Sequence, residues 1–182
     1  METVYIYPLA TLRPSLRRRL YEAQQEAARV WTRCRDWHLA ARQHHTRWPT
    51  RDDLQQATKG QFALHSQTVQ MVCHQFLANV DTARELRQTN RTIRYPYKDK
   101  RFFPLYWPAQ AVSVERGRIV LPMGRGRSSL VFKLELPEQI GGCSWSGRTA
   151  MSSTSRFQPH QSWKHLEAHT RPLIWGRSTW QR

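Results

Sequence analysis

Residues 14–44, PSLRRRLYEAQQEAARVWTRCRDWHLAARQH, carry the most regular pattern in the chain. Apolar or small side chains recur there at intervals of three and four residues, which is the period of one face of an α-helix. These positions are Leu16, Leu20, Ala23, Ala27, Val30, Cys34 and Trp37. The opposite face carries charged residues, namely Arg17, Arg18, Glu22, Arg29 and Arg33. The stretch therefore predicts one long amphipathic helix that buries its apolar stripe.

A second helical pattern begins near Ser66 and reaches toward Arg87, with a stripe at Val69, Val72, Cys73, Phe76, Val80 and Ala83. Between the two patterns, Thr50 and Asp53 have the spacing of a capping box, which predicts a short helix that Gly60 ends. Two long helices with a short connection favour an antiparallel pair. We expect Cys34 and Cys73 to be small core residues of this pair.

Strand patterns lie before and after the helices. Residues 2–9 predict a first strand, and residues 112–121 alternate around a turn at Gly117, which predicts a hairpin. A further strand is predicted by Leu130, Phe132, Leu134 and Leu136, whose apolar face we expect to lack a cover. The order favours an α+β fold, in which the first strand pairs with the later ones and the helices are inserted into a small β-barrel or sheet.

The chain divides accordingly into a first strand at 1–12, a helical lobe at 13–90, a connector with the remaining strands at 91–143, and a tail at 144–182. No apolar run has the roughly 18 residues of a membrane span, and the first ten residues lack the order of a signal peptide. We therefore expect a cytoplasmic protein without membrane contact. Three widely spaced cysteines predict neither a disulfide framework nor a zinc site.

Charge points to the class of partner. The 182 residues include 29 lysines and arginines against 13 acidic residues, which gives a formal charge of +16. Such a surface attracts phosphate backbones through counterion release, without any sequence preference. We therefore expect a nucleic-acid partner and no small-molecule substrate or cofactor.

Cations and flat rings alternate in the connector between Arg91 and Trp107, which is too rich in proline to form a helix. Cations hold phosphates while rings stack on unpaired bases, a combination typical of single-strand grooves. The alternative is that the rings belong to the core and the charges form a solvated rim. We favour the tyrosines and cations over the phenylalanines as binding residues. The candidates are Arg91, Arg94, Tyr95, Tyr97, Lys98, Lys100, Arg101, Tyr106 and Trp107.

A second candidate is the turn at residues 124–127, where Arg125 and Arg127 alternate with glycines and could hold a phosphate. The turn lacks the spacing of a nucleotide-binding P-loop. Arg17, Arg18 and Arg19 form a solvated helix face that could also follow a backbone. The pairs His44/His45 and His165/His169 do not have the order of a metal site, and we find no catalytic triad, carboxylate pair or metal-binding acid cluster.

Three stretches together resemble the N-terminal part of TnpB, the OrfB-type transposase-associated protein of insertion sequences, which is an RNA-guided DNA endonuclease. They are LHSQTVQMVCHQFLANVDTARELR, RYPYKDKRFFPLYW and GRIVLPMGRGRSSLVFKLELPE, and the resemblance covers about residues 2–140. It implies a wedge-type β-barrel interrupted by a helical recognition lobe, with guide RNA and target DNA as partners. It also implies no enzymatic activity, because the catalytic acids and zinc ribbon of that family belong to a later RuvC-like domain.

From Ser144 onward the helical and strand periods are lost, so we expect an irregular, basic tail. Four of the eight tryptophans nevertheless fall in this tail. One hypothesis is that the tail is translated out of frame. Shifting the codons by one base allows LVWTDGYELHVSV for 144–157 and AAVDLGEIHLAA for 171–182, and the latter resembles the first RuvC motif. The chain is then a truncated relic that binds nucleic acid without cutting it.

Three other functions stay open. A truncated regulator of transposition would bind guide RNA or transposon DNA in competition with the full-length protein. A basic protein-binding module unrelated to transposons would instead follow a protein partner, and its affinity would not depend on nucleic acid. A complete small nuclease is the remaining possibility, and it requires magnesium-dependent cleavage.

Overall fold

The computed structural model describes residues 4–8, 12–133, 141–145 and 150–154. Within these residues the fold is α+β, as the sequence predicts. The helices are α1 (Pro14–Gln43), α2 (Arg51–Thr58) and α3 (Ser66–Thr89), with a 3-10 turn η1 (Ala109–Ala111). The strands are β1 (Val4–Pro8), β2 (Leu105–Pro108), β3 (Ser113–Glu115), β4 (Arg118–Leu121), β5 (Leu130–Lys133), β6 (Gly142–Trp145) and β7 (Ala150–Thr154).

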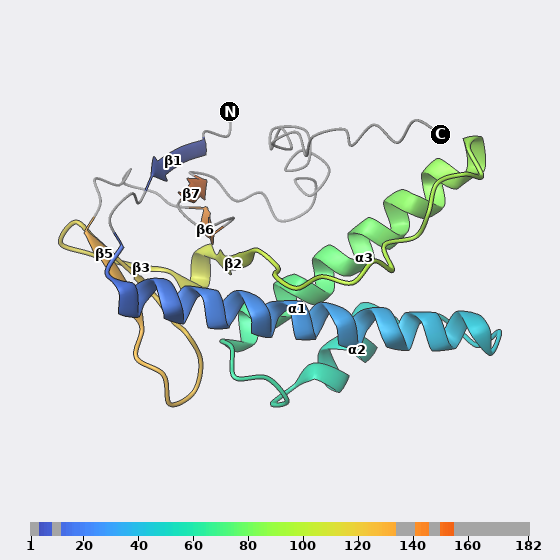
Figure 1. Ribbon diagram of the computed structural model, residues 1–182, viewed down its shortest axis with the longest axis horizontal. Coiled ribbons are helices and arrows are strands. Elements are labelled where there is room, and N and C mark those ends of the chain that lie inside the picture. Colours follow the sequence, from blue (N-terminus) through green and yellow to red (C-terminus); the bar gives the residue numbers. More distant parts are fainter. Residues whose placement is uncertain (1–3, 9–11, 134–140, 146–149, 155–182) are drawn as a thin grey trace, which may run out of the picture.

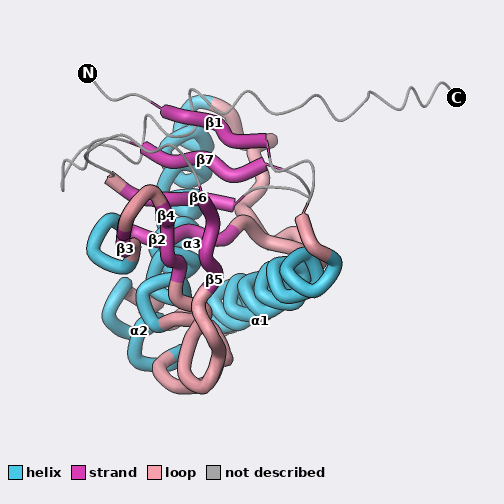
Figure 2. The backbone as a smooth tube through the Cα atoms, turned by 90° about the vertical axis from the view of Figure 1, so that its left-hand side faces the viewer, coloured by secondary structure: helices cyan, strands magenta, loops and turns pink. Residues whose placement is uncertain are grey.

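The described strands form two antiparallel sheets. The larger has the order β1-β7-β6-β2, and its first pair runs from Val4 opposite Thr154 to Pro8 opposite Ala150. Figure 2 shows β1, β7 and β6 one below another. The first strand thus pairs with a late one, and the helices lie between them in sequence, which confirms that part of the prediction. The second sheet has the order β3-β4-β5. Both described sheets are open, so the closed barrel stays a prediction.

The expected irregular tail is wrong for residues 144–145 and 150–154. β6 and β7 lie there, and β6 pairs with β2 so that Trp145 is opposite Leu105. Cys143 and Trp145 are buried, which gives β6 the apolar anchors that hold it on the core. The strand is only four residues long and includes glycine and serine, so its local pattern is weak. Residues 155–182, including the stretch 171–182 with the RuvC-like alternative reading, lie outside the described residues.

Helix α1 follows its sequence pattern at all but one position of the stripe. Pro14 occupies its first turn, where a missing N–H breaks no helical hydrogen bond. The predicted stripe is buried or half-buried from Leu16 to Cys34, but Trp37 is 37% exposed. The buried positions that follow Cys34 are His38 and Ala41, which places Trp37 on the flank of the helix. Its assignment to the buried stripe is therefore wrong.

The capping box is confirmed at α2. The Asp53 N–H donates to Oγ1 of Thr50 at 3.3 Å, and the Thr50 N–H donates to Oδ2 of Asp53 at 2.7 Å. These two bonds satisfy backbone donors that the first turn of a helix leaves free. α2 therefore begins where the sequence predicts, and it ends at Thr58, two residues before Gly60.

The expected antiparallel pairing of the long helices is wrong. The Ala63 N–H donates to Oε1 of Glu26 just before α3, and farther along both helices Sγ of Cys34 lies 3.6 Å from Sγ of Cys73. Residue numbers therefore rise along both helices in the same sense, as Figure 1 shows. The physical reason is the connection, because α2 carries the chain back beside α1 before α3 begins.

Cys34 and Cys73 are fully buried and free of disulfides, which confirms them as core residues. The thiol of Cys34 donates a hydrogen bond to Cys73, and this bond, followed by burial, raises the pKa of Cys34. Burial likewise raises the pKa of Cys143 to about 12. Both thiols therefore stay protonated and unreactive at neutral pH.

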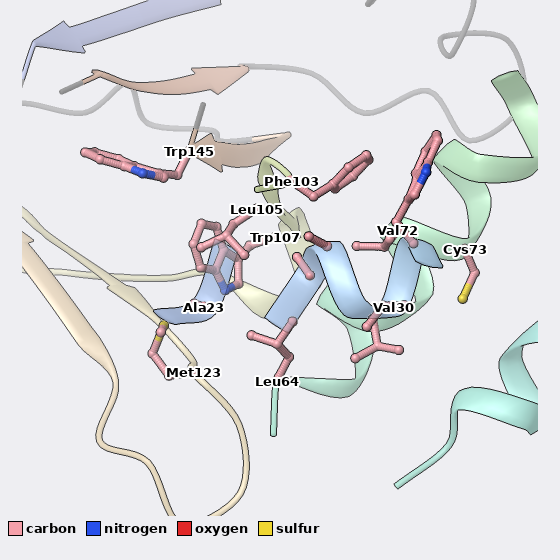
Figure 3. Close-up of a cluster of buried hydrophobic side chains, with 14 of the residues drawn as sticks. Ala23, Val30, Leu64, Val72, Cys73, Phe103, Leu105, Trp107, Met123 and Trp145 are labelled. Atoms are coloured by element: carbon pink, nitrogen blue, oxygen red, sulfur yellow. The ribbon is translucent and has the colours of Figure 1, made fainter. Parts of the chain in front are cut away.

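One continuous core joins the helices to the strands. Figure 3 shows Ala23 and Val30 of α1, Val72 of α3, and Trp107 of β2 in this cluster, with Trp145 above them. Leu130 and Phe132 are also buried in it, so the expectation that their face lacks a cover is wrong for these two residues. Leu134 and Leu136 lie outside the described residues. Within the described part of the chain, no helix is both long and apolar enough to cross a membrane.

Candidate nucleic-acid interface

The connector from Arg91 to Pro104 runs back along α1, in the space between α1 and α3 (Figure 1). Arg35 of α1 forms an ion pair with Asp99, and farther on the Phe103 N–H donates to the carbonyl oxygen of Gln24 at 3.1 Å. Residue numbers in the connector rise as those in α1 fall, so the connector runs antiparallel to α1. It forms an extended third layer that side chains of both helices hold in place. Its rings have different surroundings.

Tyr95 lies between two cations of the protein itself. The guanidinium carbon of Arg42 is 4.9 Å from the centroid of its ring, and that of Arg87 is 5.2 Å away. Its ring also meets Trp48 edge-on and stacks with Tyr97, with centroids 5.8 Å and 5.6 Å away respectively. Tyr95 is half-buried by these contacts, so its ring is largely occupied by other side chains.

Tyr97 ties the connector to the buried part of α1. Its hydroxyl and Nδ1 of His38 share a hydrogen bond of 2.8 Å. Burial, with help from the charge of Arg42, lowers the pKa of His38, while burial raises the pKa of Tyr97. Both groups are therefore neutral at physiological pH, as suits a buried hydrogen-bonded pair. Tyr97 is half-buried and acts here as an anchor of the fold.

Lys100 is not a free surface cation. Its Nζ lies 3.8 Å from the centroid of the Trp31 ring and 4.7 Å from that of Phe103. Burial lowers the pKa of Lys100, and the two rings offset part of the lost hydration of its ammonium group. Its expected contact with phosphate therefore conflicts with its place in the structure, where it faces aromatic rings.

Trp107 also belongs to the core. Its side chain is 2% exposed, and its Nε1 donates to the carbonyl oxygen of Pro122 at 2.9 Å. A ring in this position cannot stack on a base, so the sequence-based assignment of Trp107 to the interface needs correction. The alternation of β2 explains the error, since Leu105 and Trp107 share the buried face while Tyr106 is half-buried on the other.

The remaining candidate cations are exposed, in contrast to the rings. In the connector they are Arg91, Arg94, Lys98 and Arg101, and in the turn they are Arg125 and Arg127. Arg101 keeps its guanidinium carbon 5.4 Å from the ring centroid of Phe102, which leaves one side of its charged group free. The alternative of packed rings and a solvated cationic rim thus describes the connector better than a stacking groove does.

The basic turn sits against the start of α3. The Arg127 N–H donates to the carbonyl oxygen of Gly124 at 3.2 Å, and both glycines have positive φ, +115° at Gly124 and +72° at Gly126. Arg19 of α1 donates to the carbonyl oxygen of Ser128, which fastens the loop to the basic face of that helix. The turn therefore presents Arg125 and Arg127 from a fixed backbone.

We expect Gly124→Ala to lower the free energy of unfolding by about 3 kcal/mol, through backbone strain and overpacking. A Cβ at Gly124 would lie 2.8 Å from the backbone oxygen of Ala63, and backbone cannot move aside as a side chain can. Gly126→Ala is the matched control, since its φ is also positive but a Cβ there meets nothing within 4 Å. It should cost about 1 kcal/mol. Equal losses in urea denaturation would show that the close packing of the turn on α3 is wrong.

Sequence reasoning missed the role of His38 and the exposure of Trp37. A histidine on the helix gave no signal until its partner Tyr97, which is 59 residues away, was placed beside it. Among the described residues, no three His, Cys, Asp or Glu side chains are grouped so that they could hold a metal ion. His165 and His169 lie outside the described part of the chain.

Comparison with protein-family models gives no match for this chain, and comparison with curated proteins gives none either. The fold and the candidate interface define a class only: a small α+β module with a strongly basic surface.

Proposed function

We propose that this chain is a nucleic-acid-binding module that holds RNA or DNA by its phosphate backbone. The observation that carries the proposal is the separation of the predicted residues into packed rings and exposed cations. Arg94 and Lys98 of the connector and Arg125 and Arg127 of the turn all face solvent, on a chain with a formal charge of +16. Cations arranged in this way bind phosphate without reading the bases.

The finer form of the proposal follows the resemblance to TnpB. In that form the two sheets are parts of a wedge-type β-barrel, α1 to α3 are its helical recognition lobe, and guide RNA and target DNA are the partners. The chain binds these strands without cleaving them. The resemblance supports this form, because its three stretches lie between residues 64 and 138 and include most of the connector and the whole basic turn.

Fluorescence anisotropy with labelled single-stranded RNA, single-stranded DNA and duplex DNA tests the proposal. We expect all three to bind at low salt, with little preference for sequence, because phosphate contacts dominate. Adding Mg²⁺ should leave the labelled strands intact. Absence of binding to every strand would overturn the proposed function, and magnesium-dependent cleavage would overturn its non-catalytic form.

A further inference from the structure

Helices α1 and α2 enclose a shallow recess on the side of α1 opposite the connector. It has a volume of about 300 Å³ and is lined by Arg33, Asp36, Trp37, Ala40 and Ala57. Its lining thus includes two small alanine side chains and one flat ring, that of Trp37. Trp37 is 37% exposed, and it is not a member of the core cluster that the described residues form. Tryptophan is one of the residues that most often dominate the energy of binding interfaces, so an accessible tryptophan beside an open recess offers a contact to a ligand.

The lining of the recess carries one cation, Arg33, and one carboxylate, Asp36. Asp36 lies 2.8 Å from a guanidinium nitrogen of Arg35, a cation that it shares with Asp99. Arg33, by contrast, is exposed and forms no ion pair with any residue that the structure describes. A ligand that reaches Trp37 therefore meets one uncompensated guanidinium next to a flat ring.

We infer that this recess binds an unpaired nucleobase of a single-stranded segment, with Trp37 as the stacking surface and Arg33 on the adjoining phosphate. The inference rests on the proposed function and adds a stacking site to it. A flat ring beside an uncompensated cation matches a nucleotide of a strand, which carries a ring and a negative charge on one unit. Bases inside a duplex are not accessible to the Trp37 ring, so only an unpaired base fits.

The recess and the exposed cations of the turn lie toward the same side of the molecule. In Figures 1 and 2, α2 and the loop between β4 and β5, which contains Arg125 and Arg127, lie toward the same lower side of the molecule. Arg19, which fastens that loop, lies on α1, and Arg29 and Arg33 follow along the same helix. A strand that lies on the turn can therefore continue along α1 to Trp37. The recess is also open to solvent, which suits part of a polymer better than a free small molecule.

Binding of oligothymidylate and of an equally long abasic sugar-phosphate strand tests the inference. Trp37→Ala should bind oligothymidylate about tenfold more weakly than the wild type, as expected for loss of one stacked base. It should bind the abasic strand as the wild type does. Trp37→Phe should retain most of the affinity, while Trp37→Leu, which keeps apolar bulk without a flat ring, should be as weak as the alanine variant.

Two further variants complete the experiment. Leu86→Ala removes an exposed apolar side chain from α3, outside the recess, and should leave both affinities unchanged. Arg33→Gln should weaken both strands equally and reduce the salt slope by about 0.7. Circular dichroism and melting of each variant verify that it is folded.

The outcomes separate the two proposals. Failure of the wild type to bind any strand contradicts the proposed function. If the wild type binds but Trp37→Ala binds oligothymidylate equally well, only the recess is wrong, and a protein side chain becomes its better occupant. An equal loss on the abasic strand also contradicts base stacking.

Discussion

Replacing Trp31 with alanine is expected to lower the free energy of unfolding by about 3–5 kcal/mol, which is a large part of the stability of a small domain. Trp31 is fully buried on α1. Its ring meets Phe76 of α3 edge-on, with centroids 5.2 Å apart, and stacks with Phe103 of the connector at 4.8 Å. It therefore joins three layers, and its removal leaves a cavity that all three line.

Loss of the contact with Lys100 adds to the cost of the cavity. Lys100 is half-buried over the Trp31 ring, so the alanine variant leaves its ammonium group in an apolar place without that partner. Trp37→Ala is the matched control, because it removes the same side chain from the same helix at an exposed position, and it should cost less than about 1 kcal/mol. Urea denaturation followed by circular dichroism measures both. Similar costs for the two variants would contradict the described core.

The second large effect concerns binding. Changing the six exposed candidate cations together to glutamine should weaken binding to single strands by about a thousandfold at moderate salt, because each loses a phosphate contact. The six are Arg91, Arg94, Lys98, Arg101, Arg125 and Arg127. All are exposed, so the variant should melt within a few degrees of the wild type.

The control removes charge elsewhere. Lys59→Gln and Arg84→Gln neutralise exposed cations outside the connector and the turn, and together they should weaken binding only about threefold, through the general field of the protein. Anisotropy at one fixed salt concentration compares the two variants. If affinity instead falls in proportion to the number of charges removed, wherever they lie, then the connector and the turn are not a defined interface.

The helices were predictable because their patterns are local. The period of three and four residues placed α1 and α3 within a few residues, and Thr50 with Asp53 located the start of α2. The hairpin was equally local, since Arg116 and Gly117 both adopt the positive φ that its two-residue turn requires.

Tertiary contacts decided the features that sequence did not predict. The same composition in the connector suits stacked bases or packed rings, and only the nearness of Arg42, Arg87 and His38 shows that Tyr95 and Tyr97 are packed. The direction of α3 depended on α2 lying back along α1. β6 is a strand because it pairs with β2, some 40 residues earlier in the chain. No local period in the sequence predicts that pairing.

The candidate site was predictable only by residue type. Cations at Arg94, Lys98, Arg125 and Arg127 are exposed because charged groups avoid the core, and no fold was needed to expect that. Lys100 departs from this rule because its ammonium group makes cation–π contacts with two rings. Trp37 departs in the other direction, since the helix turns it away from the stripe to which its spacing assigned it.

The affinity of the wild-type protein for a single-stranded RNA, measured across a range of salt concentrations, tests the central claim most directly. If six or more cations contact phosphates, the logarithm of the association constant falls against the logarithm of salt concentration with a slope of about −4 or steeper. A slope near zero, or no association at the lowest salt, would contradict the claim that the basic surface of this protein holds nucleic acid.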